Sequence, residues 1–253
     1  MAPTQHKEVH SDGLSASPTT PARTAAQGRR AHAGLIQRDV YCNNRHHLVG
    51  SMKITAVRVA NPRWVNAYGS QKHRYKSDAE KMELVIRLAK ENVLHRTGGP
   101  FGAAIFRRED GRLISVGVNN VQRCNNSVLH AEIVAIMLAQ HSLCSFTLDV
   151  KDTATYELIS SCEPCAMCLG ALVWSGVRRL VCGATRHDAT RIGFEEGPVF
   201  PESYRYVKNR GIEFVRRVSH KQARAVLDLY ASRGGVIYNG LRQSCVKLRK
   251  SFG

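Results

Sequence analysis

Two short segments hold side chains that could form a hydrolytic metal site. His130 and Glu132 lie in the first, and Cys165 and Cys168 lie in the second, Pro-Cys-Ala-Met-Cys, which begins at Pro164. One imidazole nitrogen and two thiolates suit Zn²⁺, and three protein ligands leave the fourth tetrahedral position open for water. We therefore expect one catalytic zinc ion with a bound water or hydroxide, held by His130, Cys165 and Cys168.

Glu132 follows the ligand His130 by two residues and is placed to move protons at such a site. Zinc lowers the pKa of bound water from about 15.7 to about 7, so hydroxide is available at neutral pH. A neighbouring carboxylate can accept the proton of the water and deliver it to the substrate, which is typically worth about 10²–10⁴ in rate. We predict that Glu132 is the general acid and base.

Two non-catalytic metal sites are compatible with the same cysteines. Cys162, Cys165 and Cys168 form a C-x₂-C-x₂-C run that could hold an iron–sulfur cluster or, with His130, a closed Cys₃His zinc site. A closed site would make the protein a zinc-stabilised binding module rather than an enzyme. Neither alternative gives Glu132 a role.

Helices must position these ligands. Pro164 suits the first position of a helix, and Cys165 and Cys168 would then share a face of its first turns. The partial positive charge at the start of a helix favours thiolate over thiol, and a similar start at His130 would favour bound hydroxide.

Periodicity and turn residues predict an α/β chain from residue 77 onward. Ser77 to Glu80 form a capping-box pattern, which apolar residues at helical spacing follow. The expected helices are 77–95, 131–140, 164–175 and 221–232, and the expected strands are 101–107, 112–118, 156–160, 179–183 and 212–215. This order predicts a mixed sheet with helices packed on its faces.

Composition divides the chain into four parts. Residues 1–51 are rich in small and basic residues without periodicity, so we expect disorder. The same composition also fits a transit peptide, or sequence upstream of a start at Met52. Residues 52–76 form a lead segment of uncertain order, 77–240 the zinc-binding domain, and 241–253 a basic tail.

The charge distribution and the cysteine content limit which binding partners and which cellular compartment we expect. The formal net charge is +17, but residues 99–240, which hold the proposed site, have 17 Lys and Arg against 13 Asp and Glu. A polynucleotide-binding site should be basic around its active site, so nucleic acid is the less favoured partner. The chain has eight cysteines, which together with a metal site favour a reducing compartment. No apolar run reaches the ~18–20 residues of a membrane span. We expect a cytoplasmic protein that does not bind membranes.

Further motifs accompany the metal segments: Gly98-Gly99-Pro100-Phe101-Gly102-Ala103, Asn119-Asn120, the run from Ser161 to Ala171, and Gly193-Phe194-Glu195-Glu196-Gly197-Pro198. With His130-Ala131-Glu132, they resemble the cytidine-deaminase-like superfamily of zinc enzymes across residues 77–240, and within it the bacterial guanine deaminases. The resemblance implies a three-layer α/β/α sandwich with a central mixed sheet of about five strands.

The resemblance also implies roles for residues outside the metal motifs. Asn119 would read the edge of a base, Phe101 and Trp174 would form apolar walls, and Glu196 would be a second acid that grips the amino face. Tyr238 resembles a residue that closes the site, sometimes from the neighbouring subunit, which implies a homodimer. Considered by type alone, Phe101 and Trp174 could equally be core residues, Asn119 a turn residue and Glu196 a solvated charge.

The function that the resemblance implies is hydrolysis of guanine, a small-molecule purine base, to xanthine and ammonia. The alternatives are a tRNA adenosine deaminase, which shares the zinc motifs, or a deaminase of another aminated heterocycle or nucleoside.

Overall fold

A mixed five-stranded sheet forms the centre of the computed structural model, which describes residues 57–69, 73–149 and 154–240. The strands are β1 (Gly102–Arg107), β2 (Leu113–Val118), β3 (Tyr156–Cys162), β4 (Arg179–Ala184) and β5 (Glu213–Val215), in the order β2-β1-β3-β4-β5. β1 runs antiparallel to both of its neighbours, whereas β3, β4 and β5 are parallel. The expected mixed sheet of five strands is confirmed.

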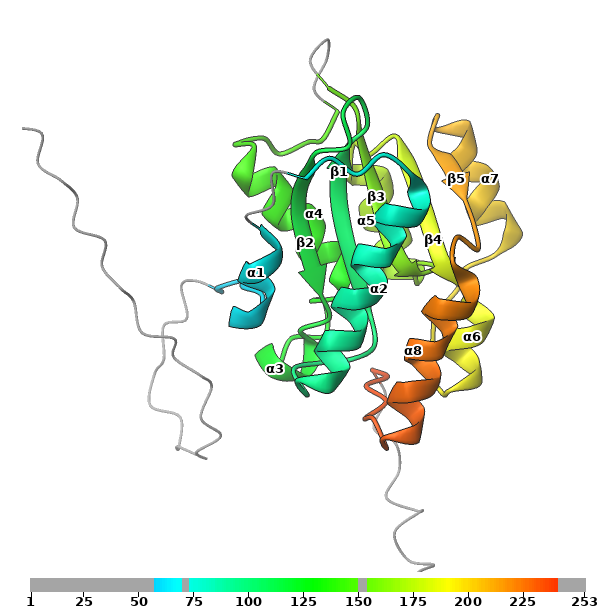
Figure 1. Ribbon diagram of the computed structural model, residues 1–253. Coiled ribbons are helices and arrows are strands. Elements are labelled where there is room, and N and C mark those ends of the chain that lie inside the picture. Colours follow the sequence, from blue (N-terminus) through cyan, green and yellow to red (C-terminus); the bar gives the residue numbers. More distant parts are fainter. Residues whose placement is uncertain (1–56, 70–72, 150–153, 241–253) are drawn as a thin grey trace, which may run out of the picture. The chain divides into compact units, whose positions relative to one another are not determined.

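Helices cover both faces of the sheet, as expected of a three-layer sandwich (Figure 1). On β1, Ala104 and Phe106 pack against α2 (Asp78–Leu94) on one face, and α8 (His220–Ser232) lies beside α2. Ala103 and Ile105 point to the other face, where α4 (Ala131–Ser142) and α5 (Ala166–Ser175) pack. Because side chains alternate along a strand, these buried neighbours supply both apolar layers.

Local sequence signals account for where the main helices begin. Ser77 caps α2 with the reciprocal hydrogen bonds to Glu80 that its capping-box pattern predicts. Helix α5 begins at Ala166 rather than at residue 164, because Cys165 has the extended backbone of an N-cap residue. The prediction that Pro164 opens this helix is therefore wrong by two residues.

Several short elements were not expected from the sequence. They are a 3₁₀ helix η1 (Arg63–Val65) and the α-helices α1 (Asn66–Gly69), α3 (Val121–Cys124), α6 (Arg186–Arg191) and α7 (Pro201–Asn209). η1 and α1 fall in the lead segment of uncertain order. The predictions for residues 1–51 and 241–253 lie outside the described residues, and the domain boundaries stay predictions.

None of the described helices combines the length and the apolar character that crossing a membrane requires.

The contact between β2 and α4 is very close at Gly117. A Cβ atom at this position would lie 2.2 Å from the carbonyl oxygen of Ala131 and 2.6 Å from the amide nitrogen of Ala135. Glycine is therefore required for α4, which carries Glu132 in its first turn, to lie at this distance from the sheet.

We predict that Gly117→Ala lowers the free energy of unfolding by about 1–3 kcal/mol, because the added methyl group must displace helix backbone. Gly170→Ala is the matched control. It lies in α5, where a Cβ atom would have no atom of another element within 4 Å, and it should raise stability by about 0.5–1 kcal/mol. Urea denaturation of the two variants measures both effects. Equal stability of the two variants would contradict the close contact at Gly117.

Candidate metal centre and pocket

The predicted metal ligands lie at the first residues of two helices. His130 is the N-cap residue of α4, and Cys165 is the N-cap residue of α5. Both have extended backbone conformations, and neither side chain forms a capping hydrogen bond with its own helix. Their side chains are therefore free to meet, and Cys168 joins them from the first turn of α5.

The geometry of this group fits a tetrahedral zinc ion. The Nδ1 atom of His130 lies 3.5 Å from the Sγ atom of Cys165 and 3.5 Å from that of Cys168. Zinc bond lengths of about 2.0–2.1 Å to nitrogen and about 2.3 Å to sulfur give a separation of about 3.5–3.6 Å at a tetrahedral angle. All three ligand atoms lie within 4.8 Å of one another. Among the described residues, this is the group of His, Cys, Asp and Glu side chains that could hold a metal.

The charge state of Cys165 also favours metal binding, whereas the hydrogen bond to Cys165, followed by burial, raises the pKa of Cys168. A hydrogen bond from Cys168, followed by one from His130, lowers the pKa of Cys165 to about 4. Cys165 is therefore a thiolate at neutral pH, and the thiolate is the form that binds metals. The helix amides at the start of α5 add partial positive charge there.

Glu132 lies in the first turn of α4, buried beside the ligands. Its Oε2 atom is 3.5 Å from the Sγ atom of Cys168, and the Ser160 hydroxyl donates to its Oε1 atom at 3.2 Å. Burial raises the pKa of the Glu132 carboxyl above its usual value. The carboxyl group is thus held in one orientation and readily takes up a proton.

Cys162 does not belong to the group. It ends β3, and its thiol donates to the Thr185 carbonyl oxygen at 3.5 Å. The structure therefore does not supply the third cysteine that the iron–sulfur and closed Cys₃His alternatives require.

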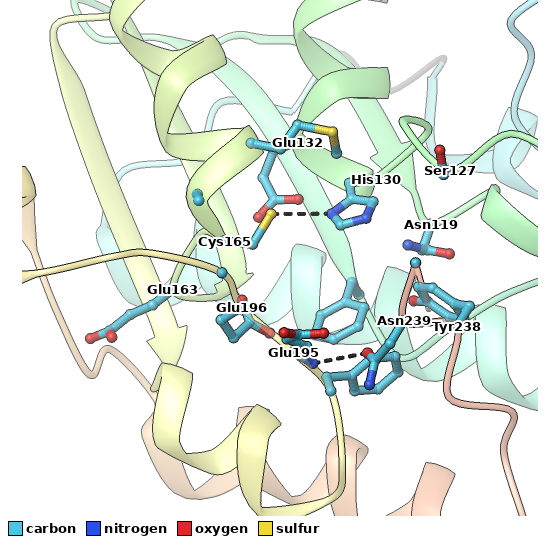
Figure 2. Close-up of a pocket in the computed structure, with 16 residues that line it drawn as sticks. Asn119, Ser127, His130, Glu132, Glu163, Cys165, Glu195, Glu196, Tyr238 and Asn239 are labelled. Atoms are coloured by element: carbon cyan, nitrogen blue, oxygen red, sulfur yellow. Dashed lines mark hydrogen bonds between the residues drawn. The ribbon is translucent and has the colours of Figure 1, made fainter. Parts of the chain in front are cut away.

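A cavity of about 370 Å³ opens over the ligands (Figure 2). Four residues that the sequence analysis assigned to the site line it together with His130, Glu132 and Cys165: Phe101, Asn119, Glu196 and Tyr238. These residues come from the start of β1, the loop after β2, the loop after α6 and the C-terminal segment, residues 233–240. The fold therefore brings together parts of the chain that are far apart in sequence.

Two polar groups of the cavity wall are buried without a hydrogen-bond partner among the described residues. They are the Nδ2 atom of Asn119 and the hydroxyl of Tyr238. The Tyr238 ring lies against Phe194, with 5.0 Å between ring centroids, and Phe194 is also 5.0 Å from Phe101. A flat ligand would therefore meet aromatic surfaces and an unused amide donor.

The two neighbouring acids differ in their surroundings. Glu195 is exposed, whereas burial, followed by the negative charge of Cys165, raises the pKa of Glu196 to about 8. Two hydrogen bonds hold the backbone of the loop that carries Glu195 and Glu196. The Ala166 amide donates to the carbonyl oxygen of Glu196 at 2.9 Å, and the Asn239 side chain accepts from the Glu195 amide at 2.9 Å.

The structure does not bring Trp174 to the cavity, which corrects the expectation that it forms a wall. Its side chain is 85% exposed near the end of α5. Leu172, two residues earlier, is buried in the core. Two residues correspond to about 200° around a helix, so Trp174 must face away from that core.

Several residues of the cavity wall were not assigned from the sequence, among them Phe194, Asn239 and Glu163. Phe194 lies two residues before Glu196 in the same motif, and Asn239 follows Tyr238, so their proximity in sequence could have indicated them. Glu163 also lines the cavity but directs its carboxylate away from it (Figure 2), toward Arg216, whose Nε donates to it at 2.6 Å. This carboxylate fixes the segment that leads into Cys165.

Comparison with known proteins places this geometry in a family. The model for the cytidine and deoxycytidylate deaminase zinc-binding region matches residues 75–184. Guanine deaminase from Bacillus subtilis is 38% identical over 133 residues, which cover 53% of this chain and 81% of the relative. A tRNA-specific adenosine deaminase from Rickettsia bellii is 40% identical over 92 residues, which cover 36% of this chain and 60% of the relative.

Solved structures give the same result. Guanine deaminase from Nitrosomonas europaea has a TM-score of 0.68 and 36% identity, and covers 72% of this chain and 100% of its own. A second solved protein structure, in complex with 2,6-diaminopurine, has a TM-score of 0.69 and 38% identity. The match covers 73% of this chain and 97% of the chain in that structure.

We predict that the protein binds one zinc ion per chain and that Cys168→Ala weakens binding by more than the roughly 10–100-fold typical of outer-shell changes. Cys162→Ala is the matched control from the same cysteine run, and it should keep one zinc ion. Metal content after dialysis, and the absorption of the Co²⁺-substituted protein, measure the difference. Loss of zinc in both variants would instead indicate a closed Cys₃His site.

Proposed function

This chain belongs to the cytidine and deoxycytidylate deaminase family of zinc-binding proteins, and from this premise we propose that it hydrolytically deaminates a purine base, guanine. The observation that carries the proposal is the wall of the cavity. An unpaired amide donor on Asn119 and the carboxyl of Glu196 face the same cavity as the metal ligands and Glu132.

The proposed reaction converts guanine and water into xanthine and ammonia. Zinc held by His130, Cys165 and Cys168 would supply hydroxide at neutral pH. Glu132 accepts the proton of the water, transfers it to a ring nitrogen of the base, and then assists the departure of ammonia. Its burial and the Ser160 hydrogen bond keep the carboxyl beside the ligands throughout.

Binding of the base is proposed to use the remaining wall. The Nδ2 atom of Asn119 donates to an acceptor on the edge of the base, and Phe101, Phe194 and Tyr238 contact its faces. Glu196 binds the donor groups. The positive charge of zinc would offset the effect of Cys165, which is the second cause of the raised pKa of Glu196 after burial.

The quaternary structure and compartment belong to the same proposal. The exposed Trp174 is a large apolar side chain on the outer surface of α5, and contact with a second copy in a homodimer would cover it. Because the described cysteines are free thiols, a reducing compartment such as the cytoplasm suits the site.

Deamination of a tRNA adenosine is the second candidate, because a tRNA-specific relative matches 92 residues of this chain. Two features favour the free base. Glu195 and Glu196 bring negative charge to the cavity, which opposes a phosphate backbone. The C-terminal segment also forms part of the cavity wall through Tyr238, Asn239 and Gly240, and this wall suits a free base better than a polynucleotide.

We predict that the zinc-loaded protein releases ammonia from guanine and not from guanosine, adenine, cytosine, cytidine or a tRNA anticodon stem. Glu132→Gln should keep the zinc and the fold but lose at least about 10² in kcat, because the proton carrier is absent. An ammonia assay with metal analysis of the variant tests both points. Release from the tRNA stem alone would establish the second candidate, and full activity of Glu132→Gln would refute the mechanism.

Glu196→Gln should lower kcat/KM for guanine by about 10–100-fold, the loss expected for a charge-assisted hydrogen bond. Glu195→Gln is the matched control, because it keeps the backbone amide that Asn239 binds and changes only an exposed side chain. It should retain kcat/KM within about twofold. Steady-state kinetics of the two variants decide the assignment, and the reverse order would transfer the role to Glu195.

A further inference from the structure

The polar groups of Asn119 are almost all occupied by its own chain. Its amide donates to the Phe101 carbonyl oxygen at 3.1 Å, its carbonyl oxygen accepts from Asn92 at 3.0 Å, and its Oδ1 atom accepts from the Val121 amide at 3.3 Å. Only Nδ2 lacks a partner among the described residues. The presentation of this one donor to the cavity therefore depends on the groups that hold the rest of Asn119.

Asn92 is central among those groups. It is a fully buried residue of α2, and its Nδ2 atom donates both to the Asn119 carbonyl oxygen and to the Gly99 carbonyl oxygen at 2.9 Å. Gly99 is itself against the cavity wall, because a Cβ atom there would lie 2.0 Å from the Tyr238 hydroxyl oxygen. One amide therefore connects two sides of the cavity.

The orientation of the Asn92 amide is set by a residue that precedes the matched family region. The Trp64 indole Nε1 donates to the Thr97 hydroxyl at 3.1 Å, and this hydroxyl donates to Asn92 Oδ1 at 2.7 Å. The Trp64 ring also stacks on His95, with 5.2 Å between ring centroids and 17° between planes. The family match begins at residue 75.

A second connection reaches the same loop from the same segment. The side chain of Asn61 pairs with β2 as a strand would, donating to the Val116 carbonyl oxygen at 2.8 Å and accepting from the Val118 amide at 3.3 Å. Arg123 donates to the carbonyl oxygen of Ala60 and, at 3.2 Å, to the Oδ1 atom of Asn120. The residues on both sides of Asn119 are thus attached to residues 60–64.

We propose that residues 60–64 position Asn119 for base recognition, through the relay Trp64–Thr97–Asn92 on one side and through Asn61 and Arg123 on the other. This role rests on the proposed function, in which Asn119 binds the base. Trp64, Thr97 and Asn92 are positioning residues, because none of them touches the cavity.

The test compares Trp64→Phe, Thr97→Val and the double variant in the full, zinc-loaded chain. Trp64→Phe keeps an aromatic ring but removes the N–H donor, and Thr97→Val removes the hydroxyl at similar volume. Each should weaken guanine binding and raise KM by about 2–10-fold, the effect of one neutral hydrogen bond, while kcat changes less than about twofold. The double variant should lose no more than the larger single effect, because both changes break the same relay.

Hydrogen–deuterium exchange of the amides of residues 119–121 provides a readout that needs no substrate. It should be faster in both single variants than in the wild type. Val85→Ala is the control, since it removes buried apolar volume from the same helix as Asn92 without touching the relay. It should lower stability but leave local exchange and KM unchanged.

The outcomes separate the two proposals. Faster exchange together with the KM effect supports the positioning role. Exchange and KM equal to those of the wild type, or a Val85→Ala effect of the same size, would overturn it. If the wild type binds no guanine, the proposed function fails, and the exchange of residues 119–121 alone then decides whether residues 60–64 hold Asn119.

Discussion

The site depends on two helices, α4 and α5, whose N-cap residues His130 and Cys165 are in contact. An N-cap side chain normally accepts a hydrogen bond from its own helix, which is worth about 0.5–2 kcal/mol. Neither His130 nor Cys165 forms that bond, because their side chains point to each other. One amide at the start of α5 finds another acceptor, because the Ala166 N–H donates to the carbonyl oxygen of Glu196. Packing away from the metal must therefore hold the two helices in position.

A buried ion-pair cluster at the opposite end of the sheet aligns two of its strands with α2. Glu157 and Arg179, at the starts of β3 and β4, form an ion pair with 2.8 Å between Oε2 and Nη1. Lys81 and Asp78 of α2 join it, and Glu157 is almost completely buried. A buried charge is tolerated only when its partners are correctly placed, so this cluster specifies one alignment of β3, β4 and α2. The other end of β3 carries Ser160 and the segment that leads into Cys165.

The features predicted from the sequence were those that depend on near neighbours. The capping box at Ser77 and the spacing of Cys165 and Cys168 are local patterns, and the structure shows both. The exposure of Trp174 depends on which side of α5 the core covers, which an apolar run does not reveal. The start of α5 depends on the extended backbone of Cys165, which the position of Pro164 does not reveal. The relay from Trp64 to Asn92 joins residues 28 positions apart through single hydrogen bonds, and no spacing rule indicates such contacts.

Under the proposed function, the two polar groups of the cavity wall distinguish between bases. Asn119 and Glu196 lie on different sides of the cavity (Figure 2), and Asn119 has a donor as its unused group. A base that fits must therefore offer an acceptor to Asn119 and a donor to Glu196. Guanine has acceptors at O6 and N7 and a donor at its N2 amino group, whereas adenine has no donor at the corresponding position. A buried donor without a partner costs about 1–3 kcal/mol, so a base that lacks the acceptor binds more weakly. The selection is thus made by the backbone contacts that leave Asn119 a single free donor, and not by the metal ligands.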